Sequence, residues 1–176
     1  MRALGPGSVS SFLKIILDVV YISLWIGLGV VGLLLLAALL LALNPSLLGD
    51  ISLSAGGEEV THRGPVAVLG LLAAAIYMAG VQVIVAQLRR IFGALTVGDP
   101  FHPENVGRLR VVGLILAGLE LGRYAVWGLS GWLLPASNTV QPTLSLTAWF
   151  SVLVVFVLAE VFREGARLRR EAELTI

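Results

Sequence analysis

The chain has 176 residues, of which 57% are hydrophobic and only 13% are charged, and its mean hydropathy is +0.94. Soluble domains carry about 25% charged residues, so this composition excludes an ordinary soluble domain and a disordered chain. The chain has no cysteine, which excludes disulfides and thiolate chemistry, and its net charge of +1 gives no general attraction to nucleic acid. The composition is that of an integral membrane protein, and we expect a single domain over residues 1–176 without direct nucleic-acid binding.

Four hydrophobic segments predict four transmembrane helices. The first contains 25 consecutive residues without a charge, Val19 to Leu43, which as a helix would cover about 37 Å, more than the hydrocarbon core of a bilayer. The third carries Glu120 and Arg123, and the other segments are uncharged except near their ends. We expect helices over about residues 12–43, 66–88, 104–134 and 144–172, with an outer loop at 44–65 and an inner loop at 89–103.

Lysine and arginine gather on one side of the predicted membrane. They lie before the first helix, between the second and third, and after the fourth, whereas Arg63 is the only cation in the outer loop 44–65. Loops rich in lysine and arginine stay on the cytoplasmic side of a membrane. The predicted fold class is therefore an all-α membrane protein, an up-down-up-down bundle of four helices with the N- and C-termini in the cytoplasm.

Glu120 and Arg123 lie about 13 to 18 Å into the third helix, near the expected midplane, where an isolated charge costs at least a few kcal/mol. At positions i and i+3 they can pair with each other, and Tyr124 lies on the same face as Glu120. We expect this face to point into the bundle, with Gln82 and Asp18 as polar neighbours. Two interpretations stay open, a proton or solute pathway and an internal ion pair that fixes helix register, and the second is favoured.

Asp18 also lies one helical turn from Lys14, near the inner end of the first helix. Residues four apart face each other on a helix, so we expect these two side chains to pair. Glu160 and Arg163, three residues apart, also lie on one helix face, and we expect local neutralisation there as well.

Two short motifs resemble chemical sites but have simpler explanations. Residues 27–32 have the G-x-G-x-x-G spacing of a pyrophosphate-binding turn, yet they lie inside a predicted span, where small residues serve helix packing. Residues 128–131 match the G-x-S-G of rhomboid-type serine proteases, but the chain's histidines, His62 and His102, are predicted in loops on opposite sides of the membrane. No metal-ligand spacing appears. We expect no catalytic residues, no metal and no cofactor.

Two cytoplasmic segments carry most of the charged residues, the loop from Arg89 to Arg110 and the tail from Arg163 to Ile176. Antiparallel packing of the third and fourth helices would bring both segments to one face. One interpretation is a docking surface; the other is burial of the apolar loop residues, with the arginines acting as topology determinants and contacts to anionic lipid. The candidate docking residues are Asp99, Pro100, Phe101, Asn105, Arg108, Arg110, Arg163, Arg167 and Arg170.

These same segments carry a family resemblance. The loop residues 98–101, Asn105 and 108–110, with the endings 161–165 and 173–176, resemble the bacterial membrane family called domain of unknown function 2975. The resemblance covers most of the chain, although the spans match only as generic hydrophobic helices and the pair Glu120 and Arg123 is not assigned to the family pattern. It implies a four-span bacterial inner-membrane protein without an established catalytic role, often encoded beside a small helix-turn-helix regulator.

The leading hypothesis is a non-enzymatic membrane module, an anchor or signalling partner whose inner loop and tail bind a cytosolic regulatory protein. That partner would be a DNA-binding regulator held at the membrane. The alternative is a small transporter or proton-coupled channel that uses Glu120 and Arg123. Four short helices enclose little room for a solute, so this alternative favours a homo-oligomer. In both hypotheses the bilayer is the constant partner.

Overall fold

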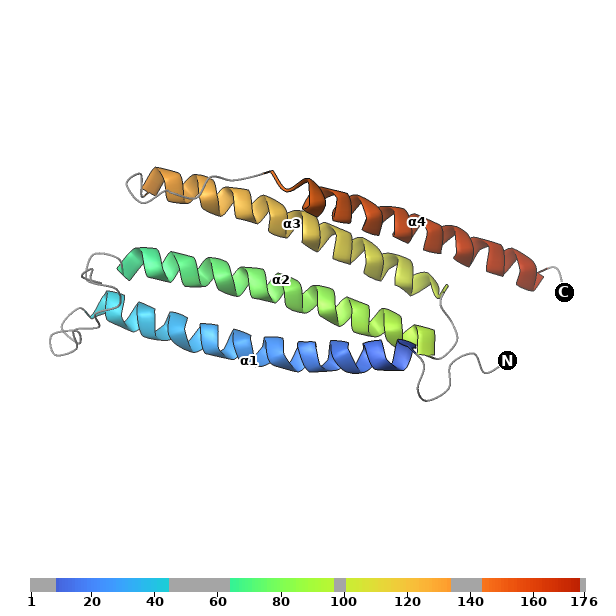
Figure 1. The fold of residues 1–176 in the computed structure, drawn as a ribbon, viewed down its shortest axis with the longest axis horizontal. Helices are drawn as coiled ribbons and strands as arrows, with labels where there is room; N and C mark the ends of the chain where they lie inside the picture. The colour runs from blue at the N-terminus through green and yellow to red at the C-terminus, as the bar shows by residue number, and fades with distance from the viewer. Residues whose placement is uncertain (1–8, 45–63, 97–100, 134–143, 175–176) are drawn as a thin grey trace. The chain divides into compact units, whose positions relative to one another are not determined.

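The computed structural model describes residues 9–44, 64–96, 101–133 and 144–174, and its regular structure is entirely helical (Figure 1). This confirms the predicted all-helical fold class. The order of elements is α1 (Val9–Leu43), α2 (Gly64–Thr96), α3 (Pro103–Leu133) and α4 (Leu146–Leu174).

Three of these helices, α1, α2 and α4, are long and apolar enough to cross a membrane. Their candidate spans are Phe12–Leu43, Val68–Leu95 and Leu146–Ala172. The charges Glu120 and Arg123 interrupt the apolar stretch of α3, which is not among the three. Length and composition therefore support three of the four predicted spans.

The chain forms two compact units. The first comprises Met1–Ile22 and Gly80–Ile176, which includes the start of α1, the second half of α2, and all of α3 and α4. The second comprises Ser23–Ala79, which includes the remainder of α1 and the first half of α2.

Within the second unit, one glycine of the predicted packing motif 27–32 lies at a helix contact. A Cβ atom at Gly27 would lie 2.6 Å from Met78 Cε, so the absent side chain lets α1 and α2 approach closely. Gly29 and Gly32 have open space where a Cβ would be. The packing explanation of this motif therefore holds for Gly27 alone among the three glycines.

The core of the first unit joins α2, α3 and α4. Ile91, Leu109 and Ala159 are buried against one another, and Leu95 and Phe162 pack against them. α3 and α4 run side by side (Figure 1). This core lies beside the charged end of α4.

This core explains an error in the predicted helix bounds. The sequence analysis ended the second helix at residue 88 and assigned 89–103 to an inner loop, whereas α2 continues to Thr96. Burial of Ile91 and Leu95 stabilises the added turns. Arg89 and Arg90 therefore lie on a helix. The other three helices begin and end within three residues of their predicted bounds.

Candidate functional site

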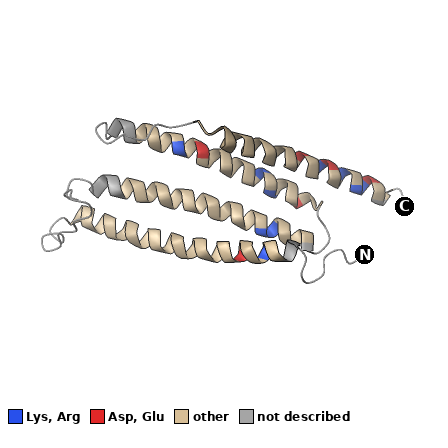
Figure 2. Ribbon diagram, viewed as in Figure 1, with Lys and Arg blue, Asp and Glu red and all other residues tan. Residues whose placement is uncertain are grey.

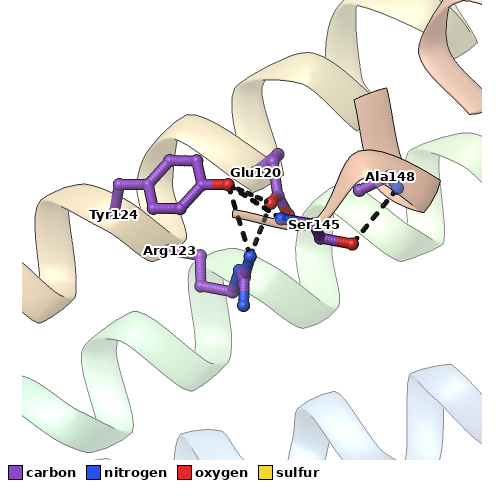
Figure 3. A network of polar contacts seen from close by, with 5 residues as sticks. All are labelled: Glu120, Arg123, Tyr124, Ser145 and Ala148. Atoms are coloured by element: carbon purple, nitrogen blue, oxygen red, sulfur yellow. Dashed lines mark hydrogen bonds and ion pairs between the residues drawn. The ribbon is translucent and has the colours of Figure 1, made fainter. Parts of the chain in front are cut away.

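Glu120, Arg123 and Tyr124 of α3 form a connected polar cluster with the start of α4 (Figure 3). Arg123 Nη2 donates to Glu120 Oε1 at 2.6 Å, and the Tyr124 hydroxyl donates to the same oxygen at 2.7 Å. The backbone N–H of Ser145 in turn donates to the Tyr124 hydroxyl at 3.4 Å. The predicted ion pair is therefore present, and Tyr124 connects it to α4.

Ser145 caps the N-terminus of α4. Its hydroxyl oxygen accepts a hydrogen bond from the backbone N–H of Ala148 at 3.2 Å, which satisfies one of the free donors at the helix start. The polar cluster is thus connected to a capped helix N-terminus, which holds Ser145 in place.

The two charges of the cluster differ in exposure. Glu120 is 9% exposed, whereas the side chain of Arg123 is 45% exposed and lies over the Tyr124 ring, 5.1 Å from its centroid. The expectation that this face points inward is correct for Glu120 and wrong for Arg123. Glu120 is the buried member that holds the cluster together.

The structure places the cluster relative to α4. Counting along α3 placed Glu120 and Arg123 near the membrane midplane. Tyr124, however, contacts Ser145, the residue directly before α4 begins, so the cluster lies within about two turns of that end of α4. Relative to α4, the cluster is near one end of the apolar stretch, and the charged end lies at the other.

Asp18 and Gln82, predicted as neighbours of Glu120, instead connect α1 to α2. Arg89 Nε donates to Asp18 Oδ1 at 2.5 Å, and the Arg89 guanidinium lies 4.2 Å from the centroid of the Tyr21 ring. Gln82 Nε2 donates to the Tyr21 carbonyl at 3.5 Å, whereas its buried Oε1 has no hydrogen-bond partner among the described residues. The five residues predicted as one polar site are thus divided between the α1–α2 contact and the α3–α4 contact.

The pairing of Asp18 corrects a second expectation. The sequence analysis assigned its carboxylate to Lys14 on the same helix, but the structure pairs it with Arg89 of α2. Arg89 was missed because residue 89 was assigned to a loop. The apolar residues Ile91 and Leu95, which continue the helix beyond it, are the sequence signal that would have placed it on α2.

At the start of α3, Asn105 is completely buried. Its side-chain oxygen accepts a hydrogen bond from Arg108 Nη1 at 2.9 Å, and its backbone N–H donates to the His102 carbonyl at 2.9 Å. Arg108 also donates to Glu104 at 2.5 Å and to the Arg90 carbonyl at 3.4 Å. Asn105 and Arg108, both predicted as docking residues, therefore fix the first turn of α3 against the end of α2.

Phe101, which precedes α3, packs against α4 and does not only face solvent. Its ring centroid lies 5.6 Å from that of Phe162. A Cβ atom at Gly165 would lie 2.5 Å from Phe101 Cδ1, so the glycine makes room for the ring. Ala166 beside it is buried. Phe101 therefore fastens the segment directly before α3 to the charged part of α4.

The exposed residues of the predicted docking surface are mostly on α4. Arg163 pairs with Glu160, and Arg167 pairs with Glu164 at 2.9 Å and with Glu171 at 3.3 Å. Figure 2 shows these opposite charges interleaved along the end of this helix. Arg110 and Arg170 are also exposed. Two further predicted docking residues, Asp99 and Pro100, lie outside the described residues.

Within the parts of the chain that the structure describes, no group of three or more histidine, aspartate and glutamate side chains is placed to hold a metal ion. The side chain of Ser130 and the whole of His62 lie outside those parts. The protease-like motif 128–131 is therefore not tested by the geometry.

These features define a class of protein: all-helical, with three helices apolar enough to cross a membrane and a charged helical surface at one end. A family model described as "Protein of unknown function (DUF2975)" matches residues 51–176. The chain belongs to this family, which confirms the resemblance noted from its sequence. The matched range includes α2, α3 and α4, and α1 lies before it. No curated protein and no solved structure matches the chain significantly.

Proposed function

We propose that this protein is a non-enzymatic, multi-pass protein of the bacterial inner membrane that binds a cytosolic regulatory protein through the charged end of α4. In this proposal all four helices cross the membrane, and both termini lie in the cytoplasm. The observation that carries it is an exposed, charged helical surface fastened to the rest of the protein by buried contacts.

The proposed binding surface is the α4 stripe, which we define as Glu160, Arg163, Glu164, Arg167 and Glu171. Residues three and four apart lie on one helix face, so these side chains form a continuous row of alternating charge. All five are exposed.

The opposite face of this segment is buried. Phe162 packs against the core of the first unit, and Ala166 is buried beside Phe101. A helix end whose only requirement was contact with water would not need to be packed against the protein in this way. Ion pairs on an exposed helix surface stabilise by only about 0.3 to 0.5 kcal/mol each, so the stripe contributes little to folding. A fixed surface of defined charge pattern is instead suited to recognition.

The arrangement of the polar residues supports crossing by α3. The carboxylate of Glu120 accepts hydrogen bonds from Arg123 and Tyr124, so the charge on this helix is partnered. A partnered charge costs less in a bilayer than an isolated one. With α3 crossing, the positive-inside rule favours a cytoplasmic α4 stripe. The family resemblance implies a regulator of the helix-turn-helix class as the partner.

A charge exchange within the α4 stripe tests the proposal. The double substitution Glu164→Arg with Arg167→Glu keeps the net charge and the i,i+3 pair. It exchanges the positions of the negative and the positive charge that a partner would contact. We expect at least a tenfold loss of partner recovery when tagged protein is purified from native membranes in mild detergent and its partners are quantified by mass spectrometry. Binding of the recovered partner, purified separately, is then measured against both proteins.

Ser151→Ala provides the control, because it changes an exposed residue of α4 outside the stripe without altering charge. The control and the exchanged variant should reach the membrane in amounts equal to the unaltered protein. Equal binding of the same purified partner to the exchanged and unaltered proteins would contradict the proposal.

A further inference from the structure

A second group of cations lies on α1 and α2, away from the α4 stripe. We propose that Lys14 and Arg90 hold the phosphodiester headgroup of an anionic phospholipid at the inner end of these two helices. We call this pair the Lys14–Arg90 site. It goes beyond the proposed binding of a cytosolic protein and is independent of it.

The ion pair between Asp18 and Arg89 sets the geometry of the site. It joins α1 to α2 with an N–O distance of 2.5 Å, so these two residues lie at one level. Lys14 is one turn from Asp18 on the same face of α1, and Arg90 directly follows Arg89 on α2. Both helix segments belong to the first unit. Lys14 and Arg90 therefore lie within one turn of the same ion pair along their helices, with Arg90 about 100° around α2 from Arg89.

The charge at this location is not balanced by the protein residues that the structure describes. Asp18 is occupied by Arg89. The side chains of Lys14 and Arg90 are both exposed, and neither has an ion-pair partner within the described ranges. The group of Lys14, Asp18, Arg89 and Arg90 thus has three positive charges and one negative charge. A phosphodiester carries one negative charge, so its binding would reduce this excess of two positive charges to one.

Apolar surface continues from the site toward the predicted membrane interior. Val83 is two turns before Arg90 on the same face of α2, and it is exposed. On α1, Ile15 and Val19 are also exposed. Cations at the edge of such a surface extend their aliphatic stems along it and place their charged ends among headgroups. This combination fits a phospholipid, whose acyl chain and phosphate are joined, better than a free anion.

The backbone of Arg90 is held in place by contacts to neighbouring helices. Its carbonyl oxygen accepts a hydrogen bond from Arg108 Nη1 at 3.4 Å, and its neighbour Arg89 is held by Asp18 and Tyr21. These contacts fix the backbone from which the Arg90 side chain extends, so the site has a defined place on α2.

Lipid titration of the full chain tests the site. The protein is delipidated in mild detergent and titrated with phosphatidylglycerol, phosphatidylcholine or inorganic phosphate while bound lipid is counted by native mass spectrometry. We expect saturable binding of phosphatidylglycerol alone, and at least a tenfold weaker affinity in the double variant Lys14→Gln with Arg90→Gln. The variant Arg110→Gln removes an exposed arginine from α3, and its affinity should stay within about threefold of the unaltered protein.

Several results would overturn the inference. These are unchanged phosphatidylglycerol affinity in the double variant, equal binding of phosphatidylcholine, and equal loss on Arg110→Gln. Binding of inorganic phosphate with the same dependence on Lys14 and Arg90 would also overturn it, because the site would then serve a free anion. If the double variant fails to fold, the single variants Lys14→Gln and Arg90→Gln are titrated in its place, and unchanged phosphatidylglycerol affinity in both would overturn the inference. Partner recovery through the α4 stripe is measured separately, so the two proposals can fail independently.

Discussion

Replacing Asn105 with leucine is expected to destabilise the detergent-solubilised protein by about 2 to 3 kcal/mol. Asn105 has no exposed surface, and its side-chain oxygen accepts a hydrogen bond from Arg108. Leucine provides no acceptor, so Arg108 loses one of its hydrogen-bond partners, and a leucine side chain must fit a place where Asn105 is completely enclosed. Arg108 also connects the start of α3 to the Arg90 carbonyl. The loss should therefore loosen the contact between α2 and α3, and thermal unfolding should begin roughly 4 to 12 °C lower.

Gly107→Ala is the matched control for this prediction. Gly107 lies two residues after Asn105 on α3, and a Cβ atom at this position would meet open space. Alanine favours the helix over glycine, so this variant should be as stable as the unaltered protein or more stable by up to about 1 kcal/mol. Asn105 would have no structural role if its leucine variant unfolded at the same temperature as the Gly107→Ala protein.

The second large effect is expected for Tyr124→Phe. This substitution keeps the ring but removes the hydroxyl that donates to Glu120 and accepts from the Ser145 backbone. Each hydrogen bond contributes about 0.5 to 1.5 kcal/mol, so we expect a loss of about 1 to 3 kcal/mol in thermal unfolding. The contact between α3 and the first turn of α4 should open before the rest of the unit. Hydrogen exchange at Ala148 and its neighbours would measure that opening.

Tyr77→Phe provides the control because Tyr77 is an exposed tyrosine on α2, and it should change stability little. The same cluster allows a test of the transport alternative. If Glu120 serves helix pairing, proteoliposomes should show the same proton permeability with the unaltered protein and with Glu120→Gln. A protein-dependent flux abolished by Glu120→Gln would instead establish a pathway and contradict the structural role.

The parts of the structure that follow from local sequence were predicted well. Long uncharged runs, bounded by charges and by proline, determine the existence and order of the helices. The i,i+3 spacing also predicted the pairing of Glu120 with Arg123, since both partners belong to one helix and need no knowledge of the others.

The contacts between helices were predicted poorly, because periodicity does not determine which residues of two helices lie at the same level. Asp18 had an apparent partner one turn away, yet Arg89 on another helix takes that place. Likewise, counting along α3 could not show that Tyr124 lies beside the start of α4. Asn105 was predicted as a docking residue, whereas it is completely buried and its side chain accepts a hydrogen bond from Arg108 at the start of α3.

The side of the membrane on which each end of the chain lies tests the proposed architecture most directly. The chain has no cysteine, so Ser10→Cys, Leu144→Cys and Glu171→Cys can each be labelled alone with a membrane-impermeant maleimide. The account predicts labelling at residue 144 in intact cells, and labelling at residues 10 and 171 only after the inner membrane is permeabilised. Residues 10 and 171 on opposite sides would mean an odd number of crossings. That result would contradict the crossing by α3 and the four-span architecture on which the cytoplasmic binding surface depends.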